Sequence, residues 1–422
     1  MKTMAGYVIR QLADTFYIIP TGQRIADRRR CLKINQTGCV IWDLLQKDLS
    51  WEELLSSYTE YVKSIEMTEN TKTVKPASIG EEASTVTAAS ISSDLSTYVL
   101  TLFQFGMIQA SAKEMQAFPF APFQAKENAY YCRYNIAGIQ VHYKGRKEWL
   151  HAFFEPFLED GKENPSAHTV KQSGISQSWH VRPLSDVPEI AGELLLFGSQ
   201  LDVYRCSGDY MLRFPSNHHL VLCTLSFDGK EAVFYYDGST QQEAVDELFY
   251  GFRAAFFYLA ALHGKYALHS ASNYYQEKAW LYSASSGTGK TTHVKLWEKL
   301  YAVPVLNGDL NLLGMEKDEV FVYGIPWCGT SGVYTTKKYP LGGIILLKRG
   351  TENRVCKLPQ DERQLYTAQR MISPAWTEKQ VDDSLLFAEK LSDRIPIRQL
   401  YCTQEPSAAA VMKEYIDKYL TI

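Results

Sequence analysis

The residues whose types and spacing most suggest chemistry lie in one stretch, SASSGTGKTT, at positions 283–292. In the pattern G-x-x-x-x-G-K-[ST], glycines let backbone amides curl around phosphates, while the lysine and the hydroxyl reach the terminal phosphates and a magnesium ion. Gly289, Lys290 and Thr291 match the pattern, and Ala284 stands where its first glycine is expected. Alanine adds only one methyl group there, so the stretch predicts a nucleotide site with ATP and Mg²⁺ as cofactors.

The predicted contacts extend along the whole loop. An apolar strand at 279–282 precedes it and a helix at 292–300 follows it, so the positive end of the helix faces the bound anion. Strand, loop and helix thus occur in the order that such a site requires. The expected nucleotide-binding residues are Ser285, Ser286, Gly287, Thr288, Gly289, Lys290, Thr291 and Thr292.

A magnesium-bound nucleotide also needs an acidic ligand at the end of a neighbouring strand. The apolar run 303–306 leads to Asp309, and a strand–helix–strand crossover would bring Asp309 beside Thr291. The dipeptide Asn307-Gly308 is also a common turn, so a plain turn is the alternative. We expect Thr291 and Asp309 to hold the metal.

With these residues identified, the segment 250–420 resembles HPr serine kinase/phosphorylase and its relatives. The loop SGTGKTT is also similar to that of ATP-dependent phosphoenolpyruvate carboxykinase, which shares this P-loop fold. The resemblance implies a histidine on a strand upstream of the loop, beside the catalytic acid. His269, in ALHSAS, stands at the matching position, and a hydrogen-bonded interior histidine is the alternative. The catalytic residues implied are His269, Asp309 and Lys290.

One carboxylate of that family is missing. HPr kinases carry two adjacent aspartates, one a base and the other a magnesium ligand, but here the pair reads Gly308-Asp309. Either His269 takes the proton of the hydroxyl, or Asp309 is both base and metal ligand. A third option is positioning alone, because a serine hydroxyl needs little deprotonation before a loose phosphoryl-transfer transition state. The lost acid also argues against reverse phosphorolysis.

Residues further along are candidates for the acceptor side of the site. Those expected to wall it are Trp327, Cys328 and Gly329. Those that could face the phosphoryl charge are Lys337, Lys338, Lys348 and Arg349.

The N-terminal segment has the pattern of a small domain of strands and helices. Runs 7–19 and 29–34 predict short strands, and Asn35 or Thr37 can cap the helix that follows. Residues 64–90 have almost nothing apolar to bury and predict a flexible insertion.

Two further signals mark helix ends in this segment. Ser50 and Glu53 predict a capping box at the start of the second helix. Gly106 is expected to end the helix that contains Leu95 and Val99.

Residues 5–110 resemble the PqqD-like domain, most closely in INQTGCVIWDLL. The resemblance implies a winged-helix-like module that binds the leader of a peptide substrate as an extra strand at the sheet edge, beside the last helix. The peptide-binding residues implied are Arg29, Cys31, Lys33, Leu95 and Val99. A purely structural winged helix is one alternative, and DNA binding through Arg28-Arg29-Arg30 is another.

Composition limits the remaining choices. The 422 residues predict two or three domains, and a net charge of −3 gives no reason to bind nucleic acid or an anionic membrane. We find no signal peptide and no apolar run long enough to span a membrane. The eight cysteines are scattered, so we expect a reducing, cytoplasmic environment without disulfides or zinc.

The expected fold is therefore multidomain, α+β and α/β. It consists of a PqqD-like winged helix at 1–112, a linker at 113–128, a β-rich region at 129–236 and an HPr-kinase-like P-loop domain at 237–422. The last domain begins with a long helix at 242–264, whose aromatic stripe is typical of a core.

The expected function is that of an ATP-dependent kinase acting on a Ser or Thr hydroxyl of a ribosomally made precursor peptide. One alternative is a kinase of a protein or small metabolite. Another is a nucleotide-binding scaffold, without turnover, that delivers a peptide to other maturation enzymes. The sequence leaves open the peptide, the residue phosphorylated, and the oligomeric state.

Overall fold

A computed structural model describes residues 1–21, 31–70, 87–120, 130–159, 174–284, 289–403 and 405–420. The chain divides into two compact units and mixes helices with large sheets, as the multidomain α+β expectation requires. The first unit comprises 1–129, 181–225 and 233–248, and the second comprises 130–180, 226–232 and 249–422. The finer division into three domains and a linker stays a prediction.

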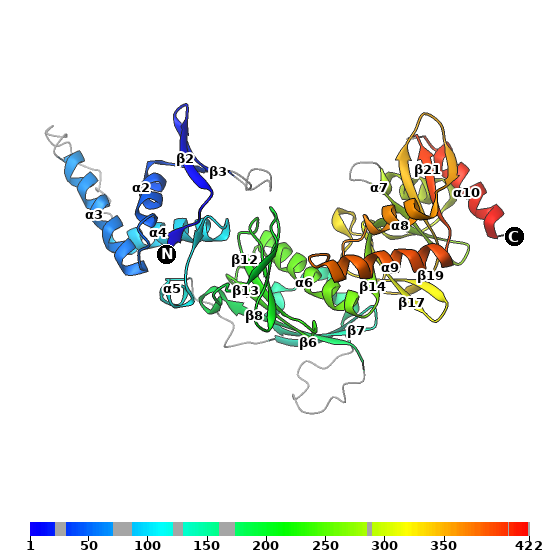
Figure 1. The fold of residues 1–422 in the computed structure, drawn as a ribbon, viewed down its shortest axis with the longest axis horizontal. Coiled ribbons are helices and arrows are strands. Elements are labelled where there is room, and N and C mark those ends of the chain that lie inside the picture. Colours follow the sequence, from blue (N-terminus) through cyan, green and yellow to red (C-terminus); the bar gives the residue numbers. More distant parts are fainter. Residues whose placement is uncertain are drawn as a thin grey trace, which may run out of the picture. The chain divides into compact units, whose positions relative to one another are not determined.

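The first unit begins with a three-stranded sheet, drawn in blue in Figure 1. Its strands β2 (Tyr7–Leu12), β3 (Thr15–Pro20) and β4 (Leu32–Ile34) pair antiparallel in that order. The run 7–19, where short strands were expected, forms a hairpin that turns at Ala13, whose φ is +52°. In the described chain, β4 has a partner strand only on its β3 side.

Three helices share a core with this sheet, and the predicted signals lie at their ends. The helices are α2 (Gln36–Leu45), α3 (Trp51–Asn70) and α4 (Ala88–Gln104). The Asn35 side chain accepts from the Gly38 amide at 2.9 Å, and Ser50 and Glu53 form the expected capping box. Gly106, at φ +66°, directly follows the C-cap of α4, which confirms the predicted stop.

Two expected irregular segments are partly helical. In the insertion expected at 64–90, α3 continues to Asn70 and α4 starts at Ala88, because extending a formed helix costs less than nucleating one. In the linker expected at 113–128, α5 (Ala112–Ala117) is held by a capping box of Ser111 and Glu114. Residues 71–86 and 121–129 lie outside the described chain.

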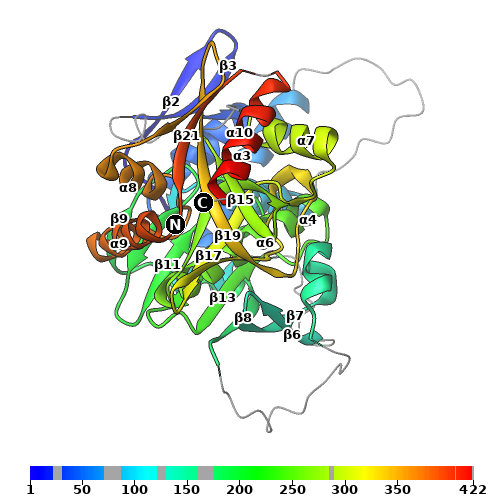
Figure 2. The ribbon, with the colours of Figure 1, turned by 90° about the vertical axis from the view of Figure 1, so that its right-hand side faces the viewer.

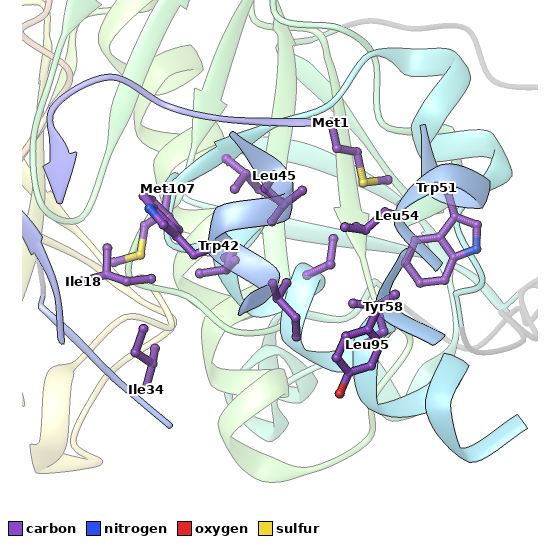
Figure 3. Packing of buried hydrophobic residues seen from close by; sticks show 14 of the residues in the cluster. Met1, Ile18, Ile34, Trp42, Leu45, Trp51, Leu54, Tyr58, Leu95 and Met107 are labelled. Carbon is purple, nitrogen blue, oxygen red and sulfur yellow. The ribbon is translucent and has the colours of Figure 1, made fainter. Parts of the chain in front are cut away.

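The core of this small domain is shown in Figure 3, where Trp42, Leu45, Leu54 and Leu95 come together from the three helices. All four side chains are at most 3% exposed. Short strands β1 (Lys2–Thr3) and β5 (Ile108–Gln109) pair beside them.

The glycine of the INQTG motif has a packing reason. A Cβ at Gly38 would lie 2.0 Å from the Tyr98 hydroxyl oxygen, so the α2–α4 contact requires a residue without a side chain.

Five more strands complete the first unit, in the order β13-β12-β11-β10-β9. Their bounds are β9 Glu193–Leu196, β10 Asp202–Arg205, β11 Asp209–Arg213, β12 Leu220–Ser226 and β13 Glu231–Tyr236. Before β12, the Glu247 carboxylate accepts the amides of His218, His219 and Leu220 at 2.7–3.0 Å. The His219 ring bonds separately to Asp237 at 2.6 Å, so the two adjacent histidines do not act as a pair.

The second unit holds β6 (Tyr130–Ile136), β7 (Ile139–Gly145) and most of β8 (Ser176–Pro183), together with the larger part of α6 (Gln242–Leu262). The main sheet of this unit is formed by the strands that come after α6 along the chain. The strands of that sheet are β14 Lys265–Tyr275, β15 Lys278–Ser283, β16 Val305–Asn307, β17 Leu310–Glu316, β18 Glu319–Tyr323, β19 Lys338–Arg349, β20 Arg354–Lys357 and β21 Ile397–Cys402. Its helices are α7 Lys290–Tyr301, α8 Gln360–Ala368, α9 Glu378–Arg394 and α10 Ser407–Leu420.

Alternating side chains of this sheet build two cores. On β15, Leu281 packs with Leu391 of α9, whereas its neighbour Tyr282 packs in the cluster that holds Trp297 of α7 and Met412 of α10. Figure 2 shows α7 and α10 on one face of the sheet and α8 and α9 on the other. The sheet therefore presents β15 to α7 with the phosphate-loop sequence between them.

The expected strand–helix–strand crossover is formed by β15, α7 and β16, and β14 lies between its two strands. β15 and β16 both pair antiparallel with β14 and so run parallel to each other, on either side of it. None of the described helices is long and apolar enough to cross a membrane.

Candidate active site

The strands β14, β16 and β17 bring the candidate catalytic residues together. β16 and β17 lie end to end along β14, and only Gly308 and Asp309 separate them. The Ser270 amide donates to the Asp309 carbonyl at 2.9 Å, so this two-residue bend stays attached to β14. The flanking pairs are Ser272 with Asn307 and His269 with Leu310.

The bend is held by one buried amide side chain. The Asn307 Oδ1 atom accepts from the amides of Asp309 and Leu310 at 2.9 and 3.1 Å. In a regular ladder His269 and Asp309 would point to opposite faces, because His269 pairs with Leu310. The bend removes that alternation and allows the two side chains to meet.

His269 Nε2 lies 3.2 Å from Asp309 Oδ1. The hydrogen bond from His269 lowers the pKa of the Asp309 carboxyl, and the charges of Lys290 and Arg253 lower it further. The His269 backbone is fixed on both sides, because its amide donates to Arg370 O at 2.8 Å and its carbonyl accepts from Ser283 Oγ at 2.6 Å. Asp309 is therefore a rigidly placed carboxylate that stays ionised at neutral pH.

Lys290 is the first residue of α7, and Gly289 before it adopts a left-handed conformation with φ +105°. The Lys290 side chain is 9% exposed, and burial lowers its pKa. Among the described residues, none accepts a hydrogen bond from Lys290 Nζ. A buried ammonium needs acceptor oxygens around it, so the position fits a residue that binds an anion.

The rest of the expected nucleotide site is only partly described. Thr291 is half-buried and Thr292 is exposed, within the first turn of α7. The expected contacts Ser285, Ser286, Gly287 and Thr288 lie outside the described residues. The described part of the loop end thus comprises Gly289 to Thr292.

Magnesium fits the same donor set. Magnesium prefers oxygen ligands, and the Asp309 carboxylate and the Thr291 hydroxyl are groups of that kind. In the described ranges no group of three or more His, Cys, Asp or Glu side chains could hold a metal by itself.

A neighbouring loop closes the space beside Gly308. A Cβ at Gly308 would lie 2.2 Å from Ser331 Oγ, which instead donates to the Cys328 carbonyl at 2.7 Å. The Gly308 amide also bonds to Val333 O at 3.3 Å. The position where the resemblance implies a second carboxylate is thus filled by this loop.

The expected acceptor wall is corrected for two of its three residues. Trp327 and Cys328 are 1% and 0% exposed, and Trp327 Nε1 donates to the Phe249 carbonyl at 3.0 Å, so both are core residues. Gly329 does face the site, because a Cβ there would lie 2.9 Å from an Asp309 carboxylate oxygen.

Two cations that the sequence did not single out belong to the site. Arg253, on α6, interacts electrostatically with Asp309, and Arg370, just after α8, does so with Lys290. Of the lysines expected to face the phosphoryl charge, Lys338 pairs with Glu316 at 2.7 Å and Lys348 lies over the Tyr401 ring. The sequence pattern did not identify Arg253 because this residue lies within an aromatic stripe of the helix whose other residues are typical of a core.

The expected peptide site in the first unit is also partly corrected. Cys31 and Lys33 are exposed, just before β4 and on it, where an added strand would pair. Leu95 and Val99 are 0% and 2% exposed in the domain core, because the apolar face of α4 packs inward. They cannot contact a peptide in this conformation, and Arg29 lies outside the described residues.

Comparisons with known proteins assign no family to this chain. No protein-family model and no curated protein matches it. Among solved structures, the Hpr(Ser) kinase/phosphatase from Coxiella burnetii is similar over 36% of this chain and 97% of its own, at 9% identity and a TM-score of 0.22. Both family resemblances stay predictions.

Proposed function

We propose that this chain is an ATP- and Mg²⁺-dependent kinase that phosphorylates a Ser or Thr hydroxyl of a ribosomally made peptide. The observation that carries the proposal is the contact between His269 and Asp309 beside the buried Lys290. A carboxylate, an imidazole and a buried ammonium at the start of a helix are the groups that phosphoryl transfer uses.

Each group has a role that follows from its charge. Bound ATP would supply the phosphoryl group, and Thr291 with Asp309 would hold its magnesium. Lys290 would neutralise the terminal phosphates. Asp309 has a lowered pKa and is a weak base, so His269 is the better acceptor for the proton of the hydroxyl.

The acceptor would be held through its leader at β4. Cys31 and Lys33 are exposed there, and the outer edge of β4 has no partner strand among the described residues. Unpaired backbone groups at such an edge favour an added strand. Tethering the leader would raise the effective concentration of the hydroxyl at the kinase site.

A second candidate is a nucleotide-binding scaffold that delivers a peptide to other maturation enzymes without turnover. The observation that favours it is the closure of the Gly308 position by Ser331, which excludes a second carboxylate there. The two candidates differ in whether bound ATP is consumed.

Steady release of ADP decides between them. The protein is incubated with Mg²⁺-ATP and the precursor peptide encoded beside it, and ADP is followed for wild type and Lys290→Ala. The kinase proposal expects turnover that requires the peptide and is lost in Lys290→Ala. Tight ATP binding without ADP release would establish the scaffold, and turnover of a metabolite without peptide would establish a small-molecule kinase.

The peptide edge is tested separately. Cys31→Pro removes the amide donor directly before β4 at an exposed position, and Cys31→Ala is its matched control. Peptide binding should weaken only in Cys31→Pro. Equal peptide binding by both variants would show that the peptide does not bind at β4.

A further inference from the structure

One face of α6 lies against the loop that contacts Asp309. The Trp327 indole donates to the Phe249 carbonyl at 3.0 Å, and its ring lies 5.2 Å from that of Phe256. Arg253 is one turn from each of these two residues, so it occupies the same face of the helix. Gly329, two residues after Trp327, approaches the Asp309 side chain. α6 therefore directs Arg253 toward the candidate active site.

The Arg253 guanidinium is half-buried. It lies 4.8 Å from the centre of the Tyr250 ring, and no described residue accepts a hydrogen bond from it. Burial lowers its pKa, with Asp309 as the carboxylate that opposes the effect. A guanidinium has five hydrogen-bond donors in a planar fork. Burying these donors is costly unless a ligand or the protein supplies acceptors for them.

Several cations gather around this position. Asp309 stabilises the charged forms of both Lys290 and Arg253, and the charge of Arg370 acts on Lys290 as well. A bound polyphosphate would add negative charge beside these cations, and it would offer acceptor oxygens to Lys290 and Arg253.

We infer that Arg253 binds the terminal phosphoryl group of the nucleotide, on the Asp309 side of the site. The inference rests on the proposed function and adds a substrate-contacting residue from a helix outside the phosphate loop. Two cations, Lys290 from α7 and Arg253 from α6, would then contact the group that moves.

Such a residue acts in the transfer step itself. The bond from the terminal phosphorus to the bridging oxygen of ADP breaks, and a bond from that phosphorus to the acceptor hydroxyl oxygen forms. The hydroxyl proton goes to His269, and the bond electrons stay on ADP. Arg253 donates to the equatorial oxygens of the phosphoryl group throughout, where the charge is spread in the transition state.

Nucleotide binding tests this assignment. Calorimetry compares a non-hydrolysable ATP analogue with ADP for wild type, Arg253→Gln, Arg253→Lys and the control Arg394→Gln, whose side chain is exposed on α9. Arg253→Gln should lose about tenfold in affinity for the ATP analogue, equivalent to about 1.4 kcal/mol. Its affinity for ADP should stay within about twofold, because ADP lacks the group that Arg253 binds.

The lysine variant guards against a folding artefact. It keeps the charge but not the fork, so its loss for the ATP analogue should be intermediate, with an unchanged unfolding temperature. Equal losses for both nucleotides, or no loss for either, would overturn the role of Arg253 while leaving the kinase proposal intact. Absence of nucleotide binding by wild type would instead remove the proposed function itself.

Discussion

His269 Nε2 lies 3.2 Å from Asp309 Oδ1, although regular pairing of β14 with β17 would send the two side chains to opposite faces. The two-residue bend at Gly308 and Asp309 makes the contact possible. Because the hydrogen bond lowers the pKa of Asp309, the pair combines an ionised carboxylate with an imidazole that can accept a proton.

Removing the imidazole should slow the reaction without weakening nucleotide binding. For His269→Ala we expect kcat to fall by about 10²–10⁴, the usual contribution of a general base, with the ATP dissociation constant unchanged. Steady-state kinetics and calorimetry measure the two quantities. The control is His263→Ala, which removes an exposed histidine. A parallel loss of ATP affinity would show that His269 shapes the nucleotide site instead.

Neutralising Asp309 should uncouple magnesium from nucleotide binding. In Asp309→Asn the affinity for ATP should no longer rise when Mg²⁺ is added, because an amide is a poorer ligand than a carboxylate. Calorimetry with and without Mg²⁺ measures this. Asp318→Asn, in the exposed turn before β18, serves as the control. An undiminished magnesium effect in Asp309→Asn would assign the metal to other ligands.

A side chain at position 308 should be destabilising because of one neighbour. Gly308→Ala places a methyl group 2.2 Å from Ser331 Oγ, and overpacking of this kind costs about 1–3 kcal/mol of unfolding free energy. The double variant Gly308→Ala/Ser331→Gly should recover most of the loss. Urea unfolding of the four proteins gives the coupling energy. Additive effects would mean that Ser331 does not set the space at this position.

His219 should make a pH-dependent contribution to the stability of the first unit. The hydrogen bond to Asp237 raises the His219 pKa above its unfolded value of about 6.5, so its stabilisation is complete below that pH and is lost as pH rises through the folded pKa. Asp237→Asn should therefore destabilise the protein more at about pH 5 than at about pH 9. Thermal unfolding across this range measures it.

A second background controls that measurement. In His219→Asn, the effect of Asp237→Asn should no longer depend on pH, because the titrating partner is gone. The Asp237 carboxylate also accepts from the Ser239 amide at 2.9 Å, and the side-chain oxygen that Asp237→Asn retains can still accept there, which keeps the local turn. A pH dependence that persists in this background would assign it to another group.

Local sequence signals predicted elements better than they predicted contacts. The Asn35 cap, the Ser50 capping box and the Gly106 helix stop are each confirmed, since they depend on neighbouring residues alone. Leu95 and Val99 were placed at the peptide site although they are core residues, because periodicity identifies an apolar face but not what covers it.

The active-site cluster shows the same limit. His269 and Asp309 were expected near each other from a family resemblance and the strand pattern, and the structure brings them into contact. Arg253 and Ser331 could not be found in the same way. Their approach to Asp309 and Gly308 depends on how α6 and the loop after Trp327 pack, which no local pattern encodes.

The most direct test of the central claim is the mass of the precursor peptide after incubation with the full chain and Mg²⁺-ATP. We predict the addition of one phosphoryl group on a Ser or Thr, with none added by Lys290→Ala. A peptide of unchanged mass, with wild-type protein that binds ATP and is folded, would contradict the account.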